Sequence, residues 1–361
     1  MKIRSVEIGR LTVPLRKPFK TALRTLVTSE TLVVKVHLDN DMVGWGAAAP
    51  TAVITGDTLG SIRAALTEVL IPQLCGLDIS DYESVLAKIN GGIVRNSSPR
   101  AALDMAVYDL VGQLYNAPLY KLLGGYRSSF ETDITVSVNS PEEMVGDALQ
   151  FVQDRFTTLK LKVGTDAKVD IARVKKIREA VGPDIKLRLD ANQGWTAKEA
   201  IRTITMMEDM GLDIELIEQP VKAHDLDGLK QVTDSVETLI LADESVFSPE
   251  DAFRVLRIRA ADLINIKLMK AGGIHNALKI NALAESCGVE CMLGCMIENK
   301  IGITAAAHLA GGKKNITRMD LDAPFLLAQD FVEGGVSFDG PRIILPVATG
   351  LGIMGVANLE S

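Results

Sequence analysis

Histidine and cysteine are scarce in this chain of 361 residues, which contains four of each. Cys287, Cys291 and Cys295 are spaced by four residues, whereas zinc knuckles and redox motifs use a CxxC spacing. A zinc site or Cys–His catalysis is therefore poorly supported. We expect these cysteines and Cys75 to be reduced thiols in the core and in loops.

Long apolar runs and an excess of positive charge are also missing. No stretch reaches the about 18 apolar residues that mark a membrane-spanning helix. The N-terminal segment alternates like a strand and lacks the apolar run of a signal peptide. The formal net charge of −7 argues against a nucleic-acid partner. We expect a cytoplasmic protein that acts on small molecules and assembles as a homo-oligomer.

Hydrophobic patterning divides the chain into segments of different character. Residues 1–50 alternate as strands do, and the apolar residues of 60–125 recur at helical spacing. From residue 126 onward, short apolar strands alternate with helical segments, which is typical of a parallel sheet. The predicted strands are DITVSV, TLKLKVG, IKLRLDAN, LIEQP, LILADE, LINIKL, VECMLG and ITRMDLD.

Eight strand–helix units are the number that a TIM barrel requires. A doubly wound open sheet is disfavoured because no GxGxxG motif follows the first of these strands. We therefore predict an α/β fold of three parts. Residues 1–125 form an α+β capping domain, residues 126–322 form a (β/α)8 barrel, and residues 323–361 pack back on the capping domain.

Three carboxylates, Asp190, Glu218 and Asp243, fall at the ends of successive predicted strands. In a TIM barrel these carboxyl ends form one rim, where the chemistry takes place. Oxygen ligands without histidine or thiolate favour a hard cation, so the pattern predicts a site for Mg²⁺ or Mn²⁺. The alternative is that each carboxylate makes a salt bridge or caps the following helix.

Three lysines share this rim. Lys160 and Lys162 point to the same face of one strand, because side chains alternate along a strand. Lys267 ends a strand on the opposite side of the barrel. Apolar residues fill most barrel interiors, so inward lysines are costly unless they have a role. They either pair with the carboxylates as structural groups or present an ammonium group to each face of a substrate.

Two bases on opposite faces of one carbon, with a divalent cation nearby, suit a 1,1-proton transfer. One lysine removes the proton next to a carboxylate, the resulting enediolate is stabilised, and the other lysine returns a proton to the opposite face. The base must be partly neutral, although the reference pKa of lysine is about 10.4. The nearby charge of Lys160 would lower the pKa of Lys162.

Several of these segments resemble the enolase superfamily, muconate-lactonizing subgroup, and the resemblance covers nearly the whole chain. It is carried by KLKVG, LRLDANQGW, IEQP, LADES and INIKLMKAGGI. The resemblance implies that the three rim carboxylates bind Mg²⁺, that Lys162 and Lys267 are the acid/base pair, and that Lys160 assists them.

Asp320 and Asp322 at the end of the last predicted strand distinguish among members of this subgroup. Their spacing puts both carboxylates on one face, where they form a receptor for a cation such as the α-ammonium of a peptide. This arrangement resembles the dipeptide epimerases. An N-succinylamino acid racemase or an o-succinylbenzoate synthase, whose substrates lack that ammonium, remains the alternative enzyme. A non-catalytic protein that binds small dianions is the alternative of another class.

The loop PFKTALRT at residues 18–25 and the segment VITGD resemble those of L-Ala-D/L-Glu epimerases. Arg24 is expected to bind a side-chain carboxylate of an acidic second residue; the alternatives are a solvated arginine and a dipeptide with a non-acidic second residue. Met296, Glu298 and Lys300 are candidates to line the specificity pocket. The resemblance also implies a role in recycling cell-wall peptides.

Overall fold

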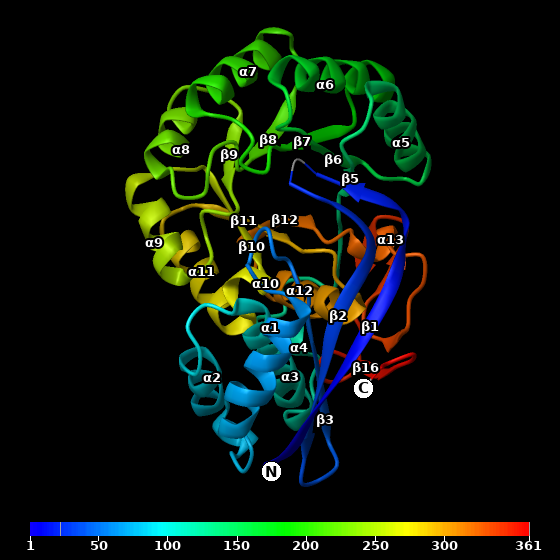
Figure 1. The fold of residues 1–361 in the computed structure, drawn as a ribbon, viewed down its shortest axis with the longest axis vertical. Coiled ribbons are helices and arrows are strands. Elements are labelled where there is room, and N and C mark those ends of the chain that lie inside the picture. Colours follow the sequence, from blue (N-terminus) through cyan, green and yellow to red (C-terminus); the bar gives the residue numbers. More distant parts are fainter. Residues whose placement is uncertain (22, 361) are drawn as a thin grey trace.

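The computed structural model describes residues 1–21 and 23–360. Ala22, which lies within the 18–25 loop, and Ser361 are outside the described residues. Figure 1 shows a ring of green to orange strands and helices, the barrel, above a blue and cyan layer made by the N-terminal third of the chain. The expected α/β fold, a barrel with an N-terminal α+β part, is confirmed.

The N-terminal part is an antiparallel sheet packed on helices. Its strands, in the order β1-β2-β3, are β1 (Ile3–Lys20), β2 (Thr25–Leu38) and β3 (Val43–Ala48). The helices are α1 (Leu59–Ala64), which continues as a π-helix (Ala65–Leu70), α2 (Tyr82–Gly91), α3 (Ser97–Leu114) and α4 (Leu119–Leu122), with short 3₁₀ turns at Ile71–Gln73 and Ile79–Asp81.

Eight parallel strands form the barrel, and each is hydrogen-bonded to its neighbour in the sequence. They are β5 (Ile134–Val136), β6 (Thr158–Lys162), β7 (Lys186–Asp190), β8 (Ile214–Glu218), β9 (Leu239–Ala242), β10 (Leu263–Lys267), β11 (Glu290–Gly294) and β12 (Ile316–Asp320). The helices that cover them are α5 (Pro141–Gln153), α6 (Ala167–Val181), α7 (Ala197–Asp209), α8 (Leu226–Thr233), α9 (Pro249–Ile258), α10 (Leu268–Ala271), α11 (Ile274–Ser286), α12 (Lys300–Gly312) and α13 (Ala323–Leu326). Seven of the eight predicted strands contain the strand found there, and the remaining one, LIEQP, overlaps β8 only at residues 216–218 because β8 begins two residues earlier.

Local sequence signals explain where the barrel helices begin and end. Thr196 and Glu199 form a reciprocal capping box at the start of α7, which satisfies free amides of its first turn. Pro249 occupies the first turn of α9, where its missing N–H costs nothing. Gly182 ends α6 with φ of 79°, a conformation that glycine adopts without strain.

Helix α3 connects the N-terminal part to the rest of the molecule through buried carboxylates. Asp104 accepts hydrogen bonds from the amides of Ile274, at 2.5 Å, and His275, at 3.3 Å, in the first turn of α11. Asp109 accepts from the amides of Trp45, at 2.9 Å, and Leu351, at 2.7 Å. The side chains of this helix are buried on almost every side, because sheet, barrel and C-terminal segment all pack against it.

The C-terminal segment contains β13 (Val332–Gly334), β14 (Ser337–Asp339), β15 (Arg342–Ile344) and β16 (Ile353–Val356), and β15 pairs with β4 (Ser129–Glu131). It also contacts the N-terminal part. The Ala328 amide donates to the Pro14 carbonyl at 2.9 Å, and Arg10 and Glu360 exchange backbone hydrogen bonds.

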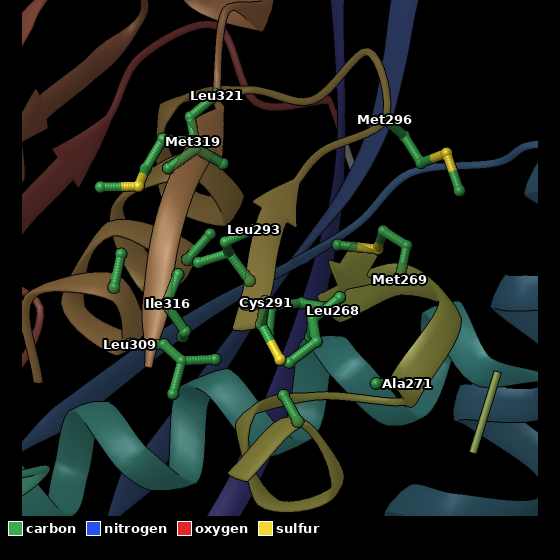
Figure 2. Close-up of a cluster of buried hydrophobic side chains, with 14 of the residues drawn as sticks. Leu268, Met269, Ala271, Cys291, Leu293, Met296, Leu309, Ile316, Met319 and Leu321 are labelled. Atoms are coloured by element: carbon green, nitrogen blue, oxygen red, sulfur yellow. The ribbon is translucent and has the colours of Figure 1, made fainter. Parts of the chain in front are cut away.

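The main apolar core runs between the barrel strands and their helices and into the N-terminal part. Figure 2 shows the region where Leu268 and Met269 of α10 meet residues of β11 and β12. Cys291 is buried there, Cys75 and Cys287 are exposed, Cys295 is partly buried, and all four are free thiols. Among the described residues, no helix is both long and apolar enough to cross a membrane.

Gly46 on β3 offers a test of how closely α3 approaches the sheet. A Cβ at this position would collide with the carbonyl oxygen of Ala102 on α3, which is backbone and cannot turn away. We expect Gly46→Ala to lower the free energy of unfolding by about 2 kcal/mol or more, measured by urea denaturation.

Gly60→Ala is the matched control. A Cβ at Gly60, on the exposed side of α1, would find Thr58 Oγ1 at 4.0 Å as its nearest atom. This variant should be neutral or up to about 1 kcal/mol more stable, since alanine favours helix. Equal stability of the two variants would show that the close approach of α3 to β3 is not required.

Candidate active site

The carboxyl ends of the barrel strands bring the charged residues predicted from the sequence to one end of the barrel. Lys162 is in register with Asp190, and Asp190 with Glu218, so these three residues lie at one level on β6, β7 and β8. Asp243 directly follows β9 and Lys267 ends β10. All five side chains are buried.

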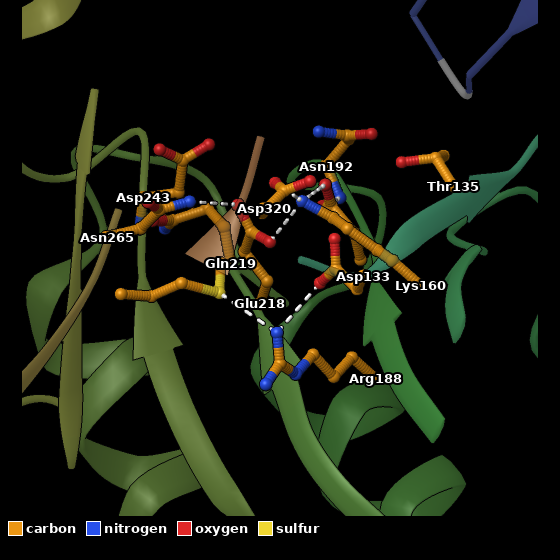
Figure 3. Close-up of polar contacts among 12 residues, drawn as sticks. Asp133, Thr135, Lys160, Arg188, Asn192, Glu218, Gln219, Asp243, Asn265 and Asp320 are labelled. Atoms are coloured by element: carbon orange, nitrogen blue, oxygen red, sulfur yellow. Dashed lines mark hydrogen bonds and ion pairs between the residues drawn. The ribbon is translucent and has the colours of Figure 1, made fainter. Parts of the chain in front are cut away.

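Lysine ammonium groups contact these carboxylates directly. Lys160 Nζ lies 3.2 Å from Asp190 Oδ2, 2.6 Å from Glu218 Oε2 and 2.7 Å from Asp320 Oδ2 (Figure 3). Lys162 Nζ lies 2.5 Å from the same oxygen of Asp190. Buried charges are tolerated when they are paired in this way.

Lys267 and Lys270 make the corresponding contacts on the other side of the barrel. Lys267 Nζ lies 2.8 Å from Asp243 Oδ2 and 3.7 Å from Glu218 Oε1, and Lys270 Nζ lies 2.6 Å from Asp243 Oδ1. Lys270 is buried on α10 and was not identified from the sequence. Its signal was present, because it is a second charge in the otherwise apolar run LINIKLMKAGGI.

The close pairing shifts the protonation of these groups in opposite directions. Burial acts to raise the pKa of Asp190, but the ammonium groups of Lys162 and Lys160 outweigh it and lower the pKa to about 2. Burial and the nearby Asp190 raise the pKa of Glu218 to about 7. Burial acts to lower the pKa of Lys267, yet Asp243 and Glu218 raise it above the usual value, so Lys267 carries a proton in this arrangement.

The donor set at this rim fits a hard divalent cation. Glu218 Oε2 and Asp243 Oδ1 are buried and have no hydrogen-bond partner, although each meets a lysine nitrogen at 2.6 Å. Among residues 1–21 and 23–360, no three acidic, histidine or cysteine side chains are already gathered around one metal position. Lys160 bridges Asp190 and Glu218, and Lys267 bridges Glu218 and Asp243. A cation would therefore bind by displacing lysine contacts from these carboxylates.

Asp320 and Asp322 lie next to this cluster, at the end of β12 and just beyond it. Both are buried, and both line the same pocket as the lysines. Asp320 contacts Lys160, whereas Asp322 Oδ2 accepts a hydrogen bond of 2.8 Å from the Thr135 amide. Burial and the charge of Asp320 raise the pKa of Asp322 to about 6. The predicted carboxylate pair is thus present, with one member already engaged by a lysine.

A pocket opens between the β1–β2 hairpin and the barrel rim. Lys162 and Lys267 both line it, from strands four places apart in the barrel order. Arg24 reaches it from the hairpin, and burial lowers the pKa of its guanidinium. The other lining residues are Phe19, Thr21, Leu23, Val53, Ile54, Thr135, Lys160, Asn192, Cys295, Met296, Ile297, Asp320 and Asp322.

The hairpin is held over the pocket by contacts with the barrel. The Val138 amide donates to the Lys20 carbonyl at 3.1 Å, and the Lys20 amide donates to Ser137 Oγ at 3.2 Å. The ring of Phe19 lies 6.0 Å from Lys162 Nζ, within the range of a cation–π contact.

Of the three residues after β11 that were expected to line the specificity pocket, only one does so. Met296 lines the pocket, whereas Glu298 is buried and accepts a hydrogen bond of 2.9 Å from the Met296 amide, so it supports the loop. Lys300 pairs with Asp330 at 2.6 Å. Thr135 and Asn192 were missed by the sequence analysis. Their signal was their place on or just after predicted strands, beside the residues that were found.

Comparison with known proteins agrees with this architecture. Residues 3–124 match the family described as "Mandelate racemase / muconate lactonizing enzyme, N-terminal domain", and residues 143–355 match "Enolase C-terminal domain-like". The chain is 56% identical over 361 residues to the L-Ala-D/L-Glu epimerase of Bacillus subtilis, covering 100% of this chain and 99% of that protein. It is 47% identical over 355 residues to the hydrophobic dipeptide epimerase of Enterococcus faecalis, covering 98% and 99%.

Solved structures give the same picture. A substrate-liganded complex of the Bacillus subtilis enzyme has a TM-score of 0.98 at 57% identity, covering 99% of this chain and 100% of that one. The dipeptide epimerase of Enterococcus faecalis, complexed with Mg and the dipeptide L-Leu-L-Tyr, has a TM-score of 0.95 at 47% identity, covering 98% and 100%. These relatives are named epimerases, which confirms the expected enzyme class, an isomerase. The chain belongs to the mandelate racemase / muconate lactonizing enzyme family of the enolase superfamily.

Proposed function

We propose that this protein is a Mg²⁺-dependent dipeptide epimerase that inverts the α-carbon of the C-terminal residue of dipeptides such as L-Ala-L-Glu. The observation that carries the proposal is the placement of Lys162 and Lys267 on opposite sides of one pocket that also contains a carboxylate pair. The names of the relatives support the same reaction. Its setting is the recycling of cell-wall peptides in the cytoplasm, by a homo-oligomer.

The chemistry follows from where the charged side chains lie. Asp190, Glu218 and Asp243 would hold Mg²⁺, which when bound would supply positive charge beside the substrate carboxylate. One of the two lysines takes the α-proton from its side of the substrate, and the other delivers a proton from the opposite side. Lys160 adds a fixed positive charge, since Asp320 and Glu218 raise its pKa well above the usual value despite its burial.

The two ends of the substrate are recognised by different parts of the pocket. Asp320 and Asp322 bind the α-ammonium of the first residue, a group that an N-acylated substrate lacks. Arg24 binds the side-chain carboxylate of the second residue. A dipeptide with a non-acidic second residue is the second candidate substrate, favoured by the apolar Leu23 and Ile54 in the same lining. N-succinylamino acids and the o-succinylbenzoate reaction are weaker candidates, because the carboxylate pair would repel their substrates.

A library of dipeptides in D₂O with Mg²⁺, followed by ¹H NMR, tests the proposed function. The α-proton signal of the C-terminal residue should disappear for free-amine dipeptides, and fastest for an acidic second residue. A chelator should stop the exchange and added Mg²⁺ should restore it. Exchange confined to N-succinylamino acids would replace the proposal with the racemase reaction.

The same NMR measurement should distinguish the roles of Lys162 and Lys267. We expect Lys162→Ala and Lys267→Ala each to lower the rate of epimerisation by about 10²-fold or more, because each variant lacks the acid or base on one face. Each should still exchange the α-proton of only one epimer. Lys230→Ala, at an exposed pair on α8, is the control and should leave the rate unchanged. Full activity in both single variants would exclude the two-base mechanism.

The ammonium assignment is tested with a substrate that differs only in that group. N-propionyl-L-glutamate is L-Ala-L-Glu without its amino group. The double variant Asp320→Asn with Asp322→Asn should lower kcat/KM for L-Ala-L-Glu by about 10²-fold, since the charge partners are lost. It should change kcat/KM for the propionyl compound much less. Equal losses on both would remove these residues from amine recognition.

A further inference from the structure

The barrel interior beneath the rim contains a chain of ion pairs where apolar side chains are usual. Arg188 of β7 contacts Asp133 Oδ2 at 2.8 Å and Glu215 Oε2 at 2.6 Å. Glu215 then contacts Arg318 at 3.1 Å, and Arg318 contacts Glu290 at 2.7 Å. Asp133 is fully buried, whereas Glu290 at the other end of the series is exposed. This chain of ion pairs therefore runs from the rim towards the opposite end of the barrel.

At the rim end of this chain of ion pairs, Arg188 contacts both carboxylates and a backbone carbonyl. Its Nη1 donates to the carboxylate of Asp133 (Figure 3) and, at 3.1 Å, to the backbone carbonyl of Met319. Its Nε donates to Glu215 at 2.6 Å. The planar guanidinium can hold these three acceptors at once, which a lysine ammonium at the end of a flexible stem cannot do in the same geometry.

Met319 lies at the seam where the last barrel strand meets the first. Its carbonyl also accepts the Asp133 amide at 3.3 Å, and the next residue but one, Leu321, donates its amide to Thr132 Oγ1 at 2.8 Å. One residue further on, Asp322 accepts the Thr135 amide. The segment that contains Asp320 and Asp322 is therefore held against the start of β5 at three successive points.

We propose that Arg188 and Asp133 are a positioning pair that fixes the spacing of Asp320 and Asp322 and so sets the preference for a free amine. The inference rests on the proposed function of those two carboxylates. Asp320 is held by Lys160 and Asp322 by the Thr135 amide, so their separation depends on how β12 sits against β5. The Arg188–Asp133 pair fixes that placement from below, without touching the substrate pocket.

The test compares two identical substitutions within the same chain of ion pairs. Arg188→Lys should lower kcat/KM for α-proton exchange of L-Ala-L-Glu by about 10- to 100-fold, because small misplacements of a binding group have effects of this size. The loss should appear mainly in KM. For N-propionyl-L-glutamate, which has no amine to place, the change should stay below about threefold by the same argument.

Arg318→Lys is the matched control. Arg318 lies on the same strand as Asp320 and pairs with Glu215 and Glu290. Within the described part of the chain, its side chain makes no hydrogen bond or ion pair with the seam residues 132–135. It should leave the ratio of the two kcat/KM values unchanged. If Arg188→Lys lowers kcat/KM equally for both substrates, or for neither, the positioning role is overturned.

Asp133→Asn is the second variant, for use if Arg188→Lys does not fold. It should lower the ratio of kcat/KM for L-Ala-L-Glu to kcat/KM for N-propionyl-L-glutamate, as Arg188→Lys should. An unchanged ratio in a folded Asp133→Asn protein would also overturn the inference. Failure of the proposed function is recognised separately. If the unsubstituted protein exchanges the α-proton of N-propionyl-L-glutamate as fast as that of L-Ala-L-Glu, then Asp320 and Asp322 do not recognise the amine.

Discussion

The mutual neutralisation of buried lysines and carboxylates at the barrel mouth is the constraint on which this site depends. Lys160, Lys162 and Lys267 carry positive charge into a buried region that contains several carboxylates. Any one of these charged groups would destabilise the fold if it were buried without an oppositely charged partner. Each carboxylate shares its lysine with a neighbour, so moving one charge alters the protonation of the next. Burial and the neighbouring Asp190 raise the pKa of Glu218 to about 7, whereas Lys162 and Lys160 lower the pKa of Asp190 to about 2.

The barrel was predictable because its signals are local and repeated. Strand–helix alternation and the helix-start signals at Thr196 and Pro249 can each be recognised in a short stretch of sequence. The charged strand ends were predictable for a related reason. Once β6, β7 and β8 are parallel and adjacent, the positions of Lys162, Asp190 and Glu218 follow from register alone.

What the sequence did not reveal depends on contacts between distant segments. The pairing of Arg188 with Asp133 joins residues that are 55 positions apart, and no periodicity marks it. The role of Glu298 in supporting the Met296 amide also required the backbone path of a loop. Lys270 was overlooked because it follows the strand and does not fall within the register that identified Lys267.

The β1–β2 hairpin contributes to the pocket from a part of the chain remote from the lysines and carboxylates of the barrel. Arg24 near its tip is only partly enclosed, whereas Lys160 at the barrel rim contacts three carboxylates. A substitution in the hairpin therefore disturbs few interactions, while one at the rim disturbs many. Under the proposed function, a change in the hairpin would alter substrate choice between descendants of one ancestor, while the two lysines proposed to transfer protons stay intact.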